Sequence, residues 1–185
     1  LIVYLLNKLY VEGKICPLPV YVDSPLSSAA TRIYAAHKEC WDEDTDHFIL
    51  NGSKPFSFGS LKYTESVEES KTLNDMAGPM IIISASGMME AGRVKHHLAN
   101  NISDARNTVL AVGYCSPETL GARILGGAPE VSIHGTIYPV RADIRRIESF
   151  SGHADYREMI DFLSCQVKEG IEKTFLVHGD LETQK

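Results

Sequence analysis

The chain has 185 residues, 44% of them hydrophobic and 23% charged, and these fractions are typical of a globular protein large enough to bury a core. Its formal net charge of −6 disfavours promiscuous binding of nucleic acid, because phosphate contacts come from Lys and Arg. An acidic average is still compatible with a local basic groove.

The ends of the sequence and its cysteines bear on the compartment of the protein. The chain begins with Leu1 and stops at Lys185 just after an apolar run, so we expect both ends to be internal to a longer polypeptide. Positions 1–6 lack the basic region and the cleavage site of a signal peptide, and no run approaches the ~18 apolar residues of a membrane span. No C-x-x-C pair occurs among Cys16, Cys40, Cys115 and Cys165. We therefore expect a reduced, cytoplasmic protein with no membrane partner.

Apolar spacing and capping residues predict alternating helices and strands in the first half of the chain. Ser24 is a candidate N-cap, and Pro25 follows it at the first helical position. In chain order we expect a helix over 1–12 closed by Gly13, a buried strand over 18–22, a helix from Pro25 to about Cys40, a loop over 41–62, a short strand near Tyr63 and a helix over about 65–74.

The second half continues the alternation. The uninterrupted apolar run at 79–83 is typical of a parallel strand covered on both faces. In chain order we expect a strand over 79–83, a loop over 84–92, a helix over about 93–102, a buried strand over 108–112, a helix launched at Pro117, a hairpin over 131–140 around His134-Gly135, a strand from about Arg141 to Phe150, a helix over about 156–167 and a strand over 174–177. This alternation predicts an α/β fold with a mostly parallel sheet flanked by helices.

Functional groups gather at the carboxyl ends of strands in such sheets, which draws attention to two segments. Asp23 is interpreted as a turn or cap residue in preference to a catalyst. The loop Ser84–Arg93 leads into a helix, where unpaired N–H groups and the helix dipole favour an anion. Ser84, Ser86 and Arg93 could add phosphate contacts. A tight strand-to-helix turn, with Gly supplying unusual dihedral angles, explains the loop equally well.

Two histidines follow apolar runs near the C-terminus, each beside a glycine and two residues before an aspartate. They are His153, in Ser151-Gly152-His153-Ala154-Asp155, and His178, in Leu176-Val177-His178-Gly179-Asp180. Histidine suits metal ligation and proton transfer near neutral pH, and a hydrogen-bonded structural role is the alternative. Two histidines cannot hold a catalytic zinc, which typically needs three protein ligands. Asp155 either orients His153 or caps the helix near Tyr156, and we favour the cap.

The other candidate groups are interpreted as structural. No G-x-S-x-G elbow occurs, so a Ser-His-Asp hydrolase is not expected. The densest basic cluster is interpreted as solvated surface and consists of Arg141, Arg145 and Arg146. No metal-ligand spacing relates the remaining histidines, which are His37, His47, His96, His97 and His134.

Five segments, in order and over essentially the whole chain, together resemble the β-CASP nucleases of the metallo-β-lactamase superfamily. Positions 78–93 (Gly-Pro-Met-Ile-Ile-Ile-Ser-Ala-Ser-Gly-Met-Met-Glu-Ala-Gly-Arg) and 112–121 (Val-Gly-Tyr-Cys-Ser-Pro-Glu-Thr-Leu-Gly) resemble central segments of that family. Positions 22–26 (Val-Asp-Ser-Pro-Leu) are similar to the start of its inserted domain, 151–155 to its motif B and 176–180 to its motif C.

The resemblance implies a β-CASP domain over 1–148 and, over 149–185, a C-terminal "RNA specificity" segment that returns to an incomplete metallo-β-lactamase αββα domain. It implies hydrolysis of RNA phosphodiester bonds between the two domains, with His178 as a ligand in a two-zinc site and His153 as a proton donor or transition-state stabiliser. The substrate-binding residues that it implies are Ser84, Ser86, Gly87, Met88, Arg93, Ser151 and Gly152.

The family also has residues that this sequence lacks. Its H-x-H-x-D-H metal motif, its further His and Asp ligands and its motif A acid precede the segments that match this chain. We therefore expect the N-terminal half of the same polypeptide to be a partner of this chain, and a homodimer is left open. The 185-residue piece is expected to bind zinc weakly at best and not to cleave RNA alone.

Three other functions are weighed against the ribonuclease. A DNA-repair nuclease is disfavoured, because that branch has an apolar residue in place of His178 and lacks the Gly-Met-Met segment. An inactive scaffold subunit is disfavoured, because such relatives have lost the histidines that this chain retains. A nucleotide-binding α/β module without hydrolytic activity stays open, and it would bind a mononucleotide at Ser84–Arg93 without metal.

Overall fold

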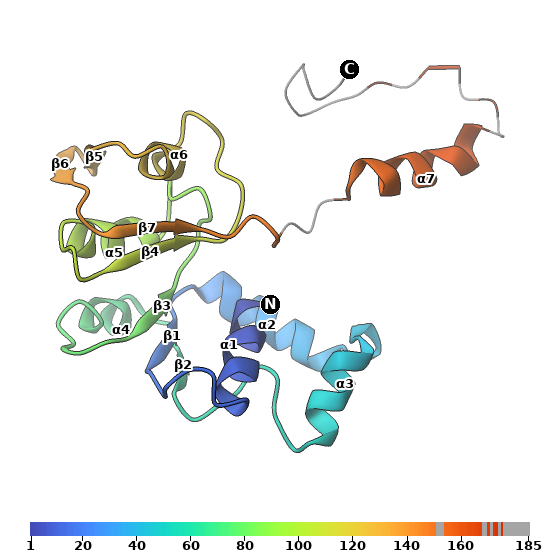
Figure 1. Ribbon diagram of the computed structural model, residues 1–185, viewed down its shortest axis with the longest axis horizontal. Helices are drawn as coiled ribbons and strands as arrows, with labels where there is room; N and C mark the ends of the chain where they lie inside the picture. The colour runs from blue at the N-terminus through green and yellow to red at the C-terminus, as the bar shows by residue number, and fades with distance from the viewer. Residues whose placement is uncertain (151–153, 168–169, 171, 174, 176–185) are drawn as a thin grey trace. The chain divides into compact units, whose positions relative to one another are not determined.

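The computed structural model describes residues 1–150, 154–167, 170, 172, 173 and 175 of the chain (Figure 1). The chain divides into two compact units, Leu1–Phe150 and Ser151–Lys185. Within the described residues, no helix combines the length and the hydropathy that crossing a bilayer requires.

Three short strands of the first unit form a parallel sheet in the order β2-β1-β3. They are β1 (Val20–Val22), β2 (Leu61–Tyr63) and β3 (Ile81–Ile83). The last residue of β1 lies opposite the last residues of both neighbours, so the three carboxyl ends share one edge of the sheet. The central strand β1 is buried throughout. The isoleucines of β3 are only half-buried, in contrast to the expected coverage on both faces, because β3 is an edge strand of this sheet.

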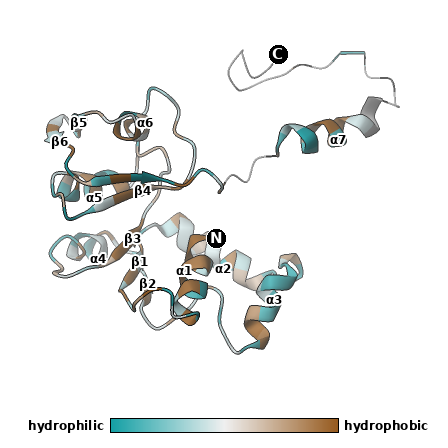
Figure 2. Cartoon of the chain, viewed as in Figure 1, coloured by the Kyte–Doolittle hydropathy of each residue, from teal (hydrophilic) through white to brown (hydrophobic). Residues whose placement is uncertain are grey.

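The helices of this half are α1 (Ile2–Val11), α2 (Pro25–Ala36), α3 (Glu43–Leu50) and α4 (Val67–Thr72), with a 3-10 turn at Lys38–Cys40. Figure 2 shows hydrophobic residues concentrated on α1 and on the strands β1 and β3, whereas α4 is mainly hydrophilic. The predicted cap of α2 is confirmed, since the Ser24 side chain accepts the Ser27 N–H and Pro25 opens the helix.

The prediction of a loop over 41–62 is wrong, because α3 lies within it. The Asp42 carboxylate accepts the Thr45 N–H at 2.8 Å, and Glu43, Asp44 and Asp46 occupy the first turn. Negative side chains are favoured at the positive end of the helix dipole. The acidic composition that suggested a loop is therefore what starts this helix.

The second half of the unit contains α5, α6 and four strands. Their bounds are α5 Val94–Asn101, β4 Thr108–Ala111, α6 Leu120–Leu125, β5 Glu130–Ile133, β6 Thr136–Pro139 and β7 Asp143–Arg146. Strands β4 and β7 pair in parallel, and β5 and β6 form the predicted antiparallel hairpin. Both turn residues, His134 (φ 51°) and Gly135 (φ 80°), adopt left-handed conformations, as tight hairpin turns require.

One hydrophobic core joins α5, α6, β4 and the β5–β6 hairpin. Its buried members are Met89, Leu98, Ile102, Ala111, Leu120, Ile124, Val131 and Ile133. The expectation of a buried strand over 108–112 is too strong, since Leu110 is 48% exposed: β4 pairs with β7 alone among the described strands. The predicted fold class, an α/β fold with parallel strands flanked by helices, is confirmed.

The second unit contains α7 (Tyr156–Val167). Asp155 caps it, as predicted, because its carboxylate accepts the N–H groups of Arg157 (2.8 Å) and Glu158 (2.9 Å). The strand predicted over 174–177 lies outside the described residues.

Candidate functional site

The loop between β3 and α5 is folded back on itself. The Met89 N–H donates to the Ser86 carbonyl at 3.0 Å, which closes a tight turn, and the Ser86 N–H donates to the Ala91 carbonyl at 3.3 Å. Gly92 has φ +80°, and a Cβ at this position would lie 2.7 Å from the Ala85 carbonyl oxygen. No other residue type fits there without a shift of the backbone. The loop thus has one defined shape.

The loop is also fastened to the start of α6. The Gly121 N–H donates to the Met88 carbonyl at 3.0 Å, and the Leu120 N–H donates to the Glu90 carboxylate. A Cβ on Gly121 would lie 2.7 Å from the Cys115 Sγ and 3.0 Å from the Met88 carbonyl oxygen. The close packing of Gly121 against Met88 holds the outer part of the turn in place.

Two adjacent backbone amides of this turn have no hydrogen-bond acceptor within the described part of the chain. They belong to Gly87 and Met88, which are both exposed, and the Ser86 hydroxyl likewise has no acceptor there. A Cβ on Gly87 would meet nothing within 4 Å, so the turn has open space beside this residue. Adjacent backbone N–H groups in a turn form a concave site for an anion.

The other members of the predicted phosphate site are engaged in internal contacts. The Ser84 hydroxyl donates to the Asp23 carbonyl at 3.0 Å, and Arg93 forms an ion pair with the Asp23 carboxylate at 2.7 Å. The first amide of α5, that of Val94, donates to the Ala85 carbonyl at 3.4 Å. The open donors therefore lie in the turn that precedes α5 and not at the start of the helix.

Asp23, at the carboxyl end of β1, is the centre of a buried polar cluster. Its side chain is 0% exposed and accepts four side-chain hydrogen bonds. At Oδ1 the donors are Thr64 Oγ1 (2.5 Å) and Arg93 Nη1 (2.7 Å). At Oδ2 they are Ser70 Oγ (2.6 Å) and His97 Nε2 (2.6 Å). All the acceptor positions of this carboxylate are occupied, so no position is left for a hydrogen bond from a substrate. This supports the interpretation of Asp23 as a structural residue.

The cluster stabilises the charged form of the Asp23 carboxyl. Burial by itself raises the pKa of Asp23, but the hydrogen bonds from Ser70, Thr64, His97 and Arg93 outweigh it and lower the pKa from 3.8 to about 2. Since a carboxylate can only accept, the bond at Oδ2 places a proton on Nε2 of His97. The other ring nitrogen, Nδ1, is buried without a partner among the described residues.

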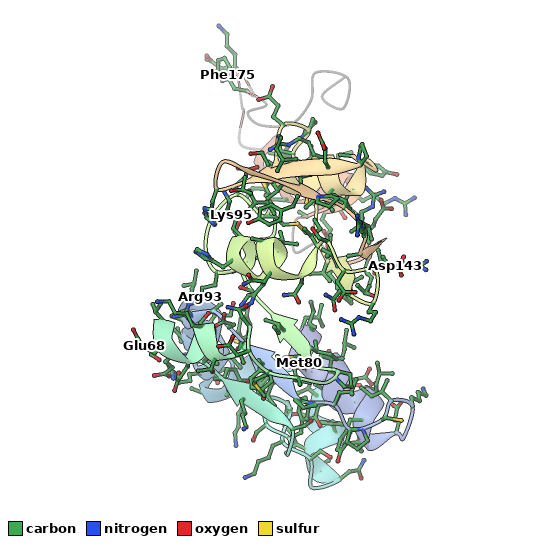
Figure 3. The ribbon with its side chains drawn as sticks, turned by 90° about the vertical axis from the view of Figure 1, so that its left-hand side faces the viewer. Glu68, Met80, Arg93, Lys95, Asp143 and Phe175 are labelled. Atoms are coloured by element: carbon green, nitrogen blue, oxygen red, sulfur yellow. The ribbon has the colours of Figure 1, made fainter. Side chains whose placement is uncertain are left out.

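The cluster connects the strands to the loop. Arg93, the residue before α5, also donates to the carbonyls of Thr64 (3.4 Å) and Glu65 (2.8 Å) at the end of β2. Figure 3 shows Arg93 between α4, which carries Glu68, and α5, which carries Lys95. The end of the loop is therefore tied to β1 and β2, while its middle is tied to α6.

Thr64, Ser70 and His97 are partners of Asp23 that are not among the residues predicted from the sequence. Two features of the chain point to them. Thr64 follows β2 directly, as Asp23 follows β1, and neighbouring parallel strands end side by side. His97 lies four residues after Arg93, so the two side chains share one face of the start of α5.

The predicted C-terminal site lies outside the described residues. This applies to His153 and His178, the proposed catalytic and zinc-binding histidines, and to the substrate contacts Ser151 and Gly152. Among the residues that the structure does describe, no three His, Cys, Asp or Glu side chains come close enough to hold a metal ion. These residues alone do not fit a zinc site.

Comparison with known proteins identifies two family domains in the chain. Residues 1–124 match the model of the Beta-Casp domain, and residues 137–185 match that of the Zn-dependent metallo-hydrolase RNA specificity domain. The first match alone covers more than half of the 185 residues.

Several curated proteins are similar over nearly the whole chain. Ribonuclease TTHA0252 of Thermus thermophilus is 37% identical over 179 residues, which are 96% of this chain and 40% of that protein. The RNase J-like protein of Methanocaldococcus jannaschii is 30% identical over 97% of this chain and 40% of its own length. Transcription termination factor FttA of Methanosarcina mazei is 30% identical over 91% of this chain and 27% of its own length. The chain thus spans less than half of each of these relatives, and it belongs to the β-CASP family of the metallo-β-lactamase superfamily.

Proposed function

We propose that this chain is the RNA-binding part of a zinc-dependent ribonuclease. The observation that carries the proposal is the open Ser86–Met88 turn, whose two adjacent amides and hydroxyl have no acceptor among the described residues, in a loop fixed to β1, β2 and α6. The match of residues 137–185 to an RNA specificity domain supports RNA as the anion that this turn binds. The acidic net charge of −6 favours such local, shape-defined contacts over a broad basic surface.

The turn would bind one phosphate of the RNA backbone. The N–H groups of Gly87 and Met88 and the hydroxyl of Ser86 donate to phosphate oxygens, and the exposed Met88 side chain lies beside them. Ser84 and Arg93 bond to Asp23 and do not contact the phosphate. They hold in place the loop that carries the three donors. This division modifies the predicted site, in which all five named residues of this loop contact the substrate.

Catalysis is proposed for the complete polypeptide, with a β-CASP domain over 1–148. In it, His178 is a zinc ligand in a site of two ions, and His153 is a proton donor or transition-state stabiliser near the scissile phosphate. Ser151 and Gly152 contact the substrate. Zinc supplies a hydroxide nucleophile at neutral pH and polarises the phosphate. Because the described residues include no group of three His, Cys, Asp or Glu side chains that could hold a metal ion, we infer that further ligands come from elsewhere in the complete polypeptide.

Replacing Gly87 with Pro is expected to weaken RNA binding by about tenfold or more. Proline removes the Gly87 N–H, and a charge-assisted hydrogen bond contributes about 1.5–3 kcal/mol. Gly87 is the second residue of the Ser86–Met89 turn, a position that favours proline, and its φ is not positive. Fluorescence anisotropy of a labelled single-stranded RNA with the 185-residue chain measures the change.

Gly87→Ala is the matched control, because it adds a Cβ into open space and keeps the N–H. It is expected to bind RNA as the unaltered chain does. Equal affinities for the Pro and Ala variants would contradict the assignment of this turn. Tight binding of mononucleotides with no affinity for RNA would favour the non-hydrolytic nucleotide-binding module instead.

A further inference from the structure

A pocket of about 460 Å³ lies beside the loop, between α4, α5 and the β5–β6 turn. Residues 90–93 of the loop form part of its wall, so it adjoins the Ser86–Met88 turn along the chain. Helix α4 contributes Lys71, followed by Asn74, and α5 contributes Lys95, His96 and Asn100. His134 enters from the hairpin. A volume of a few hundred Å³ suits a small ligand or one unit of a polymer.

The pocket is positively charged in a chain of net charge −6. Neither Lys71 nor Lys95 forms an ion pair within the described residues, and Lys95 is half-buried. The guanidinium of Arg93, which also lines the pocket, is neutralised by Asp23. The carboxylate of Glu90 is held by the Leu120 N–H at the start of α6. The two lysines are therefore left to bind an anion from outside.

The pocket also has an aromatic platform. The rings of His96 and His134 stack with their centroids 4.6 Å apart and an interplanar angle of 26°, and both residues are exposed. Each ring covers one face of the other, so a further planar group can stack on an outer face of the pair. The amides of Asn74 and Asn100 provide donors and acceptors at the same pocket.

We propose that this pocket binds one nucleotide of a single-stranded RNA, with its base on the His96–His134 pair and its two flanking phosphates on Lys71 and Lys95. Lysines along the backbone and aromatic rings for the bases are the combination by which single strands are bound without sequence preference. The identity of the polymer rests on the proposed function. The site itself is distinct from the Ser86–Met88 turn and would extend the RNA-binding surface past it.

The test uses the double variant Lys71→Gln/Lys95→Gln and a labelled RNA of about 10 nucleotides, within the span of such sites. The slope of the logarithm of the association constant against the logarithm of the salt concentration changes by about 0.7 per phosphate contact on a single strand. Loss of two contacts is therefore expected to make this slope shallower by about 1.4. Affinity at low salt should fall at least tenfold. The variant Lys14→Gln/Lys62→Gln, which removes two lysines outside the pocket, is expected to bind as the unaltered chain does.

His96→Ala tests the platform separately. It is expected to lower the affinity at least fivefold with an unchanged salt dependence, because stacking of a base contributes about 1–3 kcal/mol without releasing counterions. Thermal unfolding of each variant monitors the fold.

Unaltered RNA binding by both pocket variants, in a chain that still responds to Gly87→Pro, would overturn the pocket and leave the proposed function standing. A loss equal to that of the Lys14→Gln/Lys62→Gln control would also overturn it, because net charge would then explain the effect. Absence of RNA binding by the unaltered chain would overturn both.

Discussion

Asp23→Asn is expected to lower the free energy of unfolding by about 3–5 kcal/mol, the range for breaking a buried ion pair by removing one partner. The substitution keeps the shape of the side chain but removes the charge that Arg93 faces at 2.7 Å. It also directs an amide NH₂ toward groups that themselves donate, such as Ser70 and His97. Urea unfolding followed by circular dichroism measures the loss. Because the cluster anchors the loop, RNA binding should weaken as well.

Asp104→Asn is the matched control. Asp104 also forms an ion pair with an arginine, Arg106, at 2.6 Å, but both groups are at the surface. Its replacement is expected to leave the free energy of unfolding nearly unchanged, since exposed ion pairs contribute little. Equal effects of the two substitutions would show that the Asp23 cluster does not stabilise the fold.

The pH dependence of stability gives the Asp23 prediction a second readout. The pKa of Asp23 is lowered to about 2 in the folded chain, against 3.8 ordinarily, so the folded state binds fewer protons at this group than the unfolded state between these values. The contribution is fully present above pH ~4 and is lost as the pH falls toward 2, by about 2 kcal/mol in total. The stability difference between the unaltered chain and Asp23→Asn should therefore narrow over this range. A constant difference would contradict the assigned charge state.

His178→Ala and His153→Ala are both expected to slow RNA cleavage by the complete polypeptide strongly, but for different reasons. Removing a metal ligand at position 178 should lower both the bound zinc and the cleavage rate, the latter by about 100-fold or more. Removing a proton donor at position 153 should lower the cleavage rate by about 10²–10⁴-fold with the zinc content unchanged. Single-turnover cleavage of labelled RNA and metal analysis of the same samples measure both quantities.

His37→Ala serves as the control for the two histidine variants. His37 is at the surface and pairs with Glu39 at 2.7 Å, so its replacement should change neither zinc content nor cleavage. Full cleavage activity of His178→Ala would contradict the assignment of His178 as a zinc ligand. RNA cleavage by the purified 185-residue chain that disappears in His178→Ala would show instead that the chain contains a complete site.

Most of the fold follows from local sequence patterns. The helix N-cap at Ser24, the hairpin turn at His134-Gly135 and the cap at Asp155 each depend on neighbouring residues, and the structure confirms all three. The errors concern burial and one helix. Burial of β3 and β4 depends on which strands pair, and apolar runs do not encode that choice. The acidic composition after Trp41 favours a loop in the sequence, but in the structure these residues form the first turn of α3.

The location of the candidate site was predictable from the sequence. Which of its residues face the substrate and which bond to Asp23 was not. The Ser84–Arg93 segment could be identified from its position after a strand and from its small residues. The inward orientation of Ser84 and Arg93 could not, because Ser84 donates to the backbone carbonyl of Asp23 and Arg93 to its carboxylate, about 60–70 residues earlier in the chain. Contacts over such separations follow from strand order and not from local spacing.

The stacked histidines illustrate the same limit. His96 and His134 are 38 residues apart, and their sequence neighbourhoods give no reason to pair them. The hairpin brings His134 over α5, so the pair exists only once the tertiary fold has formed.

The most direct test of the account follows the backbone amides of Gly87 and Met88 by NMR during titration with single-stranded RNA. Neither N–H group has an acceptor in the part of the chain that the structure describes, and phosphate binding should shift their resonances together and saturably. We expect both shifts in the unaltered chain and a smaller shift of the Met88 resonance in Gly87→Pro. Saturable RNA binding that leaves both amide resonances unmoved would contradict the claim that this turn binds the RNA backbone.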